Sequence, residues 1–187
     1  MIKELIRISS ENNKQKVIVF ENDMHHKYFG KSKVFYQRDT IRKFLINEFE
    51  DESLLIEHNE NGAPFIKGYD NYISISHSDN LFAIQISNEN IVGVDIQIYK
   101  EGIEKGMNYF VNNNDKKNIE INRDSLHIIW AVKEAVYKLL KGKVNRYKED
   151  LTILSISDSD IVKVQCDNRI VECKFILYDT FILVYVI

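Results

Sequence analysis

The strongest regular pattern in the chain is the helical one at residues 123–143, RDSLHIIWAVKEAVYKLLKGK, which has strand-like runs on both sides. Asp124 is a candidate cap and Gly142 a stop signal for this helix. The face expected toward a core consists of Leu126, Ile129, Val132, Val136, Leu139 and Leu140. A helix that lies between strand-like runs indicates a fold that combines α and β elements.

The remaining elements follow the same logic of apolar periodicity. Residues 16–20 (KVIVF) predict a strand, and residues 24–50 predict a helix. Residues 102–121 are polar and predict helix and loop. Residues 53–66 predict two short strands joined by a glycine-containing turn. Further strands are predicted at 72–77, 81–87, 91–98, 151–156, 161–166, 169–178 and 181–187.

This order of elements predicts an α+β fold made of two similar α+β halves in one chain. We place the halves at residues 1–90 and 91–187, with an approximate boundary. A cleft between two such halves is a natural place for a ligand, so the site is expected there.

Composition narrows the class of protein. The chain has 187 residues and a formal net charge of −3, which argues against nucleic acid as a partner. No apolar run is long enough to span a bilayer, and residues 1–20 lack the features of a secretory signal. We therefore expect a cytoplasmic protein without a membrane partner, and the presence of two halves in one chain suggests a monomer. Cys166 and Cys173 are expected to be reduced thiols, although a disulfide across a hairpin stays open.

The stretch YISISHSDN (72–80) places a histidine in an unusual position. Ile73 and Ile75 alternate with serines, and His77 then continues the apolar face of the strand. Two interpretations remain open from these residues alone. His77 is either a core histidine satisfied by a neighbouring carbonyl or a group that faces a ligand.

The stretch IVGVDIQI (91–98) sets Gly93, Asp95 and Gln97 on one face of a strand. Oxygen atoms of an Asp and a Gln side by side could hold a hard cation, with the glycine allowing close approach. The alternative is an ordinary solvated strand face.

The stretch WAVKEAVYK (130–138) aligns Trp130, Glu134 and Lys138 in one stripe along a helix. Glu134 and Lys138 are also in the favourable order for a simple helix salt bridge. Lys133 can be an ordinary solvated lysine.

Basic residues gather near the predicted N-terminal helix. These basic residues indicate either a solvated charged face or a docking surface for an anion. Its members are Lys27, Lys31, Lys33, Arg38, Arg42 and Lys43.

Four motifs occur together in a specific order: NGAP (61–64), ISHS (75–78), GVDIQ (93–97) and WAVKEAVYK (130–138). In this order and spacing they resemble the 4'-phosphopantetheinyl transferases of the surfactin-synthetase-activating type. The resemblance covers about residues 35–140 and implies that family's two-lobed, pseudo-two-fold arrangement, with the site in the cleft between the lobes.

The resemblance also implies a reaction. Coenzyme A would lie in the cleft, and its 4'-phosphopantetheine arm would pass to a serine of an apo acyl or peptidyl carrier protein, releasing 3',5'-ADP. Positioning and charge neutralisation dominate such phosphoryl transfers. The resemblance assigns Mg²⁺ to Asp95 and Glu134, with Gln97 as a further ligand. It makes Glu134 the base for the serine proton and lets Lys138 hold the pyrophosphate.

The family pattern assigns the remaining site residues by position. It makes His77 the contact of the 3'-phosphate of coenzyme A, with Arg42, Lys31 and Ser76 in the same binding region. Trp130 is expected to pack beneath the site.

The sequence departs from the family pattern at two positions. Ala63 stands where the family has a lysine, and Gln97 stands where it has a second acid. Both departures favour an alternative class, a non-catalytic protein that binds coenzyme A or a carrier protein. Asp95, Glu134 and Lys138 favour the enzyme.

Overall fold

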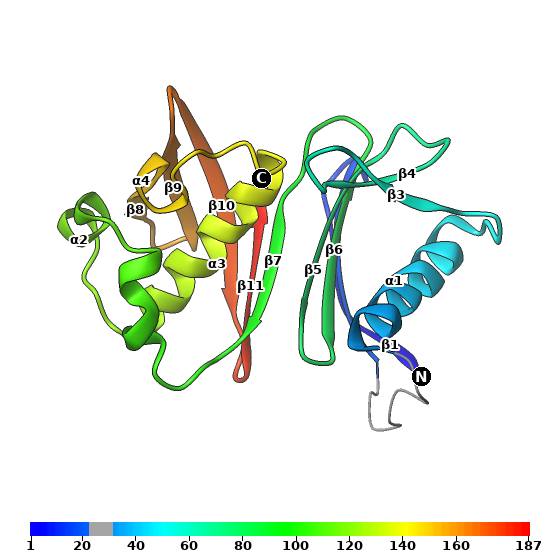
Figure 1. The fold of residues 1–187 in the computed structure, drawn as a ribbon, viewed down its shortest axis with the longest axis horizontal. Coiled ribbons are helices and arrows are strands. Elements are labelled where there is room, and N and C mark those ends of the chain that lie inside the picture. Colours follow the sequence, from blue (N-terminus) through cyan, green and yellow to red (C-terminus); the bar gives the residue numbers. More distant parts are fainter. Residues whose placement is uncertain (23–31) are drawn as a thin grey trace.

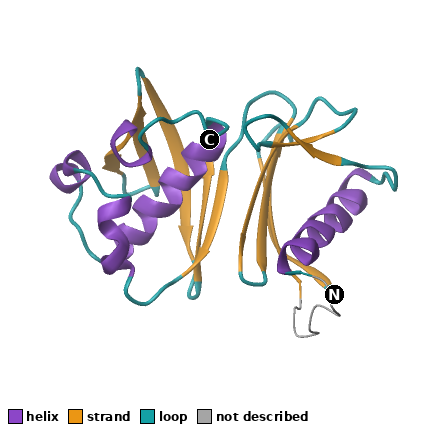
Figure 2. Ribbon diagram, in the orientation of Figure 1, coloured by secondary structure: helices purple, strands orange, loops and turns teal. Residues whose placement is uncertain are grey.

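The computed structural model describes residues 1–22 and 32–187 and combines two antiparallel sheets with a small number of helices (Figures 1 and 2). The first sheet has the order β1-β2-β6-β5-β4-β3, and the second has the order β7-β11-β10-β9-β8. The strands of the first sheet are β1 (Ile2–Ser9), β2 (Gln15–Asn22), β3 (Ile56–His58), β4 (Pro64–Ile66), β5 (Tyr72–Ser78) and β6 (Leu81–Ser87). Those of the second are β7 (Val94–Ile98), β8 (Leu151–Ile156), β9 (Ile161–Cys166), β10 (Arg169–Leu177) and β11 (Phe181–Val186). The helices are α1 (Lys33–Phe49), η1 (Ile103–Tyr109), α2 (Asn113–Asn118), α3 (Arg123–Leu139) and α4 (Tyr147–Asp150).

The elements stack as helix, sheet, sheet, helix, with α1 on the outside of the first sheet and α3 on the outside of the second (Figure 1). The α1 side buries an aromatic stack in which the rings of Phe20 and Phe44 lie 4.0 Å apart. On the other side, α3 buries Ala131, Val132 and Val136 against the second sheet. The combination of α and β elements that the sequence predicts is therefore confirmed, whereas the domain boundary near residue 90 stays a prediction.

The two sheets are joined by an apolar layer and by a row of serines. The layer consists of Val17, Val19, Leu81, Ala83, Val94, Ile96, Phe181 and Leu183. Beside it, the hydroxyls of Ser74, Ser76 and Ser78 accept hydrogen bonds from the backbone N–H groups of Val94, Ile96 and Ile98, at 3.0, 3.3 and 3.0 Å. Serine side chains of β5 thus supply the acceptors that a neighbouring strand would otherwise give to β7.

The ends of α3 differ in part from the sequence expectation. The N-cap is Asn122, whose side chain accepts the N–H of Ser125, and Asp124 lies in the first turn instead. The helix ends at Leu139, and Gly142 follows in the turn with a φ of 73°. Glycine adopts this left-handed conformation without steric cost, so it acts as the expected stop.

Other predictions are corrected or limited by the structure. The strand expected at 91–98 begins at Val94, and β1 is an additional strand that we did not predict. The part of the expected helix at 24–31, including Lys27 and Lys31, lies outside the described residues. Within the described residues, α1 begins at Lys33 with Ser32 as its N-cap.

The two cysteines do not form a disulfide, because Cys166 and Cys173 are buried free thiols. Among the helices in residues 1–22 and 32–187, none combines the length and apolar character that crossing a membrane requires.

Candidate functional site

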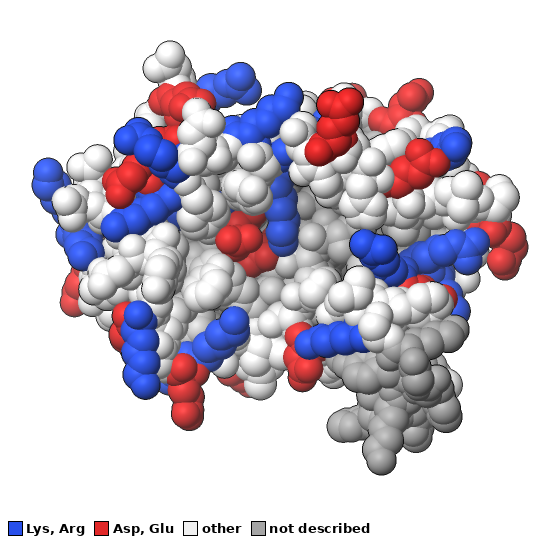
Figure 3. All heavy atoms as spheres, in the orientation of Figure 1, with Lys and Arg blue, Asp and Glu red and all other residues white. Residues whose placement is uncertain are grey.

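A cleft of about 860 Å³ lies between α1 with strands of the first sheet and the C-terminal end of α3. One wall comes from α1, including Val34, Gln37 and Arg38, and the opposite wall comes from the end of α3, including Lys138. The volume falls within the usual range for ligand pockets. In the space-filling view, Lys and Arg side chains lie on both sides of the central hollow (Figure 3).

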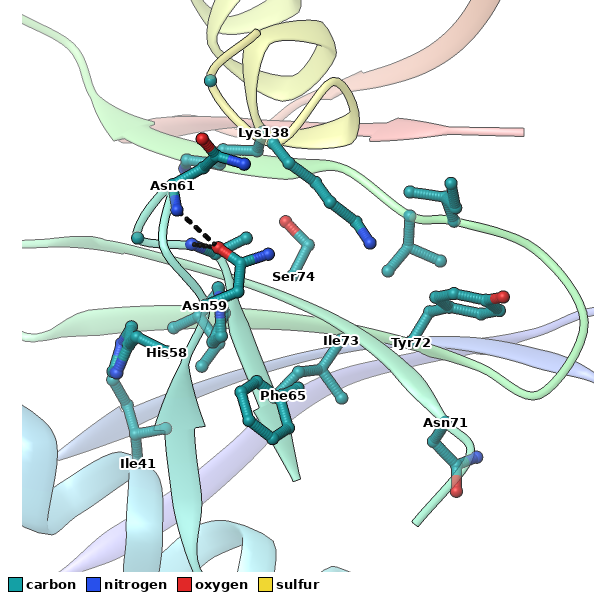
Figure 4. A pocket seen from close by; sticks show the side chains of 18 of the residues that line it. Ile41, His58, Asn59, Asn61, Phe65, Asn71, Tyr72, Ile73, Ser74 and Lys138 are labelled. Carbon is teal, nitrogen blue, oxygen red and sulfur yellow. Dashed lines mark hydrogen bonds between the residues drawn. The ribbon is translucent and has the colours of Figure 1, made fainter. Parts of the chain in front are cut away.

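The motif NGAP forms the loop between β3 and β4 and lines this cleft. The side-chain oxygen of Asn59 accepts the backbone N–H groups of Asn61 and Ala63, each at 3.0 Å (Figure 4). Gly62 has a φ of 79°, which a glycine tolerates. The loop is therefore held by its own hydrogen bonds, and Ala63 presents only a methyl group to the cleft.

His77 lines the cleft as an exposed side chain and is not a core histidine. Its Nδ1 lies 3.3 Å from Nε2 of Gln37 on α1. The cleft walls restrict solvation of the ring, which lowers the pKa of His77 from its ordinary value, and the nearby Lys138 and Lys33 ammonium groups lower it further. The neutral imidazole can therefore gain a proton when a negative charge enters the cleft.

Asp95 on β7 is the centre of a buried polar network. Its side chain accepts hydrogen bonds from Ser76 Oγ at 2.7 Å, Gln97 Nε2 at 2.8 Å and Lys138 Nζ at 2.7 Å. Lys138 Nζ also donates to the backbone oxygen of Val94 at 3.0 Å. Asp95 itself is only 5% exposed, so its orientation is fixed by these donors. Residues from three of the four motifs therefore meet at one carboxylate.

Lys138 connects this network to the cleft. Its side chain extends from α3 over β5 into the pocket, where Ser74 and Tyr72 lie nearby (Figure 4). Lys138 lines the cleft, whereas Asp95, Gln97, Ser76 and Glu134 do not. The ammonium group thus lies between the open cleft and the buried carboxylate.

Glu134 is the second carboxylate of the region and lies one helical turn before Lys138. It is partly buried, and loss of solvation raises its pKa. The buried hydroxyl of Tyr147 lies beside Glu134 and lowers this pKa, although the two groups do not form a well-aligned hydrogen bond. The negative charge of Asp95 raises the pKa of Glu134 further, so the two carboxylates interact electrostatically.

Gly93 sets the distance between β7 and α3. A Cβ atom at this position would lie 2.1 Å from the backbone oxygen of Ala135 and 3.0 Å from the backbone nitrogen of Leu139. Only glycine therefore allows the strand to lie this close to the helix. The sequence suggested close approach to a cation, whereas the structure assigns the glycine to strand–helix packing.

Lys133 differs from the solvated lysine that we expected. It is fully buried, and its Nζ donates to Asp115 Oδ2 at 2.6 Å and to the Phe110 oxygen at 2.7 Å. Burial lowers the pKa of Lys133. Asp115 also accepts the backbone N–H of Ile153, so this pair links α2, α3 and β8. The lysine before Glu134 therefore has a structural contact away from the cleft.

The basic residues of α1 are divided between two locations. Arg38 lines the cleft, whereas Arg42 is exposed, does not line it and donates to the Glu52 backbone oxygen at 3.3 Å. On the opposite side, Lys141 lines the cleft, with its Nζ 5.9 Å from the centre of the Tyr72 ring. Sequence reasoning did not single out Lys141 for ligand binding, because it lies in a turn outside any helical stripe.

The residues around Asp95 can be tested against the magnesium ion that the resemblance implies. Within residues 1–22 and 32–187, no three His, Cys, Asp or Glu side chains form a metal-binding group. Asp95 and Glu134 provide two carboxylates, and the amide of Gln97 contacts Asp95 and contains a further oxygen. An all-oxygen set with few protein ligands fits Mg²⁺, which usually keeps several waters.

No protein-family model matches the chain, and no curated protein has a significantly similar sequence.

Proposed function

We propose that this protein transfers the 4'-phosphopantetheine arm of coenzyme A to a serine of an apo acyl or peptidyl carrier protein. The main support for this proposal is that residues from three separate motifs donate hydrogen bonds to the Asp95 carboxylate. They are Ser76 from ISHS, Gln97 from GVDIQ and Lys138 from WAVKEAVYK. The fourth motif, NGAP, lines the adjoining cleft. We propose for the same reason that the chain has the two-lobed, pseudo-two-fold fold of that transferase family.

The residues that line the cleft favour binding of an anionic ligand. Arg38, Lys138 and Lys141 line it, and His77 can accept a proton there. A ligand with a pyrophosphate and a 3'-phosphate would place negative charge among these groups, which favours binding through charge-assisted hydrogen bonds. In this proposal His77 contacts the 3'-phosphate and Lys138 the pyrophosphate. Arg42 would need to move toward the cleft to take part, and Lys31 lies outside the described residues.

The transfer step needs a base near the carrier serine. The serine oxygen forms a bond to the β-phosphorus, and the bond from that phosphorus to the bridging oxygen breaks. The electron pair leaves with 3',5'-ADP. Glu134 accepts the serine proton directly or through a water, and it lies close enough to Asp95 for the two carboxylates to interact electrostatically.

Asp95, Glu134 and Gln97 would hold Mg²⁺ in this proposal. When bound, the ion would neutralise pyrophosphate charge as it shifts to the leaving group. Ser76 holds Asp95 in place through its hydroxyl.

The proposal is tested by incubating the protein with coenzyme A, Mg²⁺ and a panel of apo carrier proteins. We expect a mass gain of one phosphopantetheine on the carrier and formation of 3',5'-ADP. Glu134→Gln serves as the inactive control. Absence of transfer to every carrier, with coenzyme A bound, would reject the enzymatic proposal.

Two observations favour an alternative, a protein that binds coenzyme A or a carrier without catalysis. Gln97 directs an N–H at Asp95, where a second acid would add an anionic ligand for the metal, and Ala63 removes a cationic contact. The same experiment separates the two functions, because a binder retains coenzyme A without producing 3',5'-ADP.

A further inference from the structure

We propose that the ammonium group of Lys138 is the resident cation of the Asp95 site, and that an anion and a divalent cation therefore bind to this region cooperatively. Nζ lies 2.7 Å from Asp95 Oδ1 and 3.0 Å from the Val94 backbone oxygen. These are two oxygen atoms of the same strand, and oxygen atoms are also what a hard divalent cation requires. Lys138 and a divalent cation thus compete for Asp95.

Burial makes this ion pair different from an ordinary surface pair. The Asp95 side chain is only 7% exposed, whereas the Lys138 side chain is 27% exposed. The other two donors to Asp95, Ser76 and Gln97, are neutral. If Lys138 moves away, a buried carboxylate is left without a compensating positive charge, which is unfavourable unless another cation takes its place.

The position of Lys138 supplies a reason for it to move. Lys138 also lines the cleft, and its flexible side chain points into the pocket from the end of α3 (Figure 4). A pyrophosphate in the cleft offers the ammonium group a partner of higher negative charge. Transfer of Lys138 to that anion would leave Asp95 Oδ1 with the Ser76 hydroxyl as its remaining donor, so that a divalent cation could take the place of the ammonium group.

Thermodynamic linkage then requires the effect to be reciprocal. If the anion increases the affinity for the cation, the cation increases the affinity for the anion by the same factor. This part of the inference rests on the proposed function, because it takes coenzyme A as the anion. The competition between Lys138 and the cation does not depend on that function.

The first experiment measures Mn²⁺ binding to the protein alone by the loss of the free-ion electron paramagnetic resonance signal. Lys138→Ala should tighten Mn²⁺ binding roughly tenfold, a typical size for coupling between sites. Lys141→Ala is the matched control, because Lys141 lines the same cleft and no contact between it and Asp95 is found among the described residues. It should change the affinity far less.

Lys138→Met is a second variant in case the alanine variant does not fold, and thermal unfolding verifies each protein. Lys138→Arg keeps the positive charge and should leave Mn²⁺ binding weak. The proposal is overturned if removal of the Lys138 charge leaves Mn²⁺ binding unchanged, or if Lys141→Ala has an equal effect. Absence of Mn²⁺ binding in every variant also overturns it.

The second experiment repeats the titration with saturating coenzyme A, after subtraction of Mn²⁺ binding to coenzyme A alone. Wild-type protein should gain roughly tenfold in Mn²⁺ affinity, and the gain should be largely lost in Lys138→Ala. An equal gain in both proteins would show that Lys138 does not carry the coupling. If coenzyme A fails to bind at all, the proposed function fails, whereas the Mn²⁺ titration without it still decides whether Lys138 occupies the cation position.

Discussion

The hydroxyl of Ser76 on β5 donates to Asp95 Oδ1 on β7 at 2.7 Å, which joins the two sheets at the candidate site. Ser76 Oγ also accepts the backbone N–H of Ile96 at 3.3 Å. Ser78, two residues further along β5, makes the corresponding backbone contact with Ile98 at 3.0 Å, and no contact between Ser78 and Asp95 is found within the described residues. Ser76 is therefore both a structural residue and a positioning residue for Asp95.

This pair of serines gives a matched test. Ser76→Ala and Ser78→Ala should each lower the free energy of unfolding by about 1 kcal/mol, because each leaves a backbone N–H without its acceptor. Only Ser76→Ala should also weaken divalent-cation binding and slow transfer. Chemical denaturation and Mn²⁺ titration measure the two effects. Equal loss of cation binding in both variants would contradict the positioning role of Ser76.

Gly93→Ala should destabilise the protein strongly. The new Cβ would meet backbone atoms of Ala135 and Leu139, which cannot move aside as a flexible side chain would. Overpacking of this kind costs about 1–3 kcal/mol or more. Gly106→Ala is the control, because nothing lies within 4 Å of a Cβ there. Thermal unfolding should separate the two variants, and similar melting temperatures would refute the packing role of Gly93.

Lys133→Met should destabilise the protein by about 3–5 kcal/mol, because it leaves the buried Asp115 without its positively charged partner. Lys117→Met, on the exposed surface of α2, should change the free energy of unfolding by less than about 0.5 kcal/mol. Urea denaturation measures both. If Lys133→Met proves as mild as the control, the buried pair does not stabilise the fold.

Glu134→Gln should abolish transfer without destabilising the protein at neutral pH. The pKa of Glu134 is raised above its ordinary value of 4.5, so the folded state favours the protonated, neutral carboxyl. Ionisation of Glu134 therefore costs stability as the pH rises from the unfolded pKa through the folded one. The variant lacks this cost, so its stability relative to wild type should increase with pH over that range. Denaturation between pH 4 and 7 tests the sign.

Coenzyme A binding should be accompanied by proton uptake at His77. The pKa of His77 in the free protein lies below its ordinary value of 6.5, and a bound phosphate should raise it. Binding should therefore become tighter as the pH falls from neutral toward the free-protein pKa. Calorimetry in buffers of different ionisation enthalpy measures the proton uptake. His77→Gln should remove it for coenzyme A, whereas dephospho-coenzyme A should show little uptake with either protein.

Local periodicity explains which elements the sequence predicts well. The alternation in ISIS produces the strand β5, and the apolar stripe at 126–140 produces α3, because each pattern needs only neighbouring residues to specify one buried face. The sequence did not predict β1, because Lys3, Glu4 and Arg7 interrupt its apolar pattern. It forms as an edge strand by pairing with β2, which a single segment does not reveal.

The sequence by itself determined the α+β class and the main helices and strands, since these depend on short-range patterns. Only the tertiary structure decided what each polar side chain contacts. Lys133 and Glu134 are adjacent in the chain, yet one is buried against Asp115 and the other lies near Asp95. Arg38 and Arg42 share a helix, yet only Arg38 lines the cleft. Such differences arise because burial, solvation and charge at each position depend on residues brought together from distant parts of the chain.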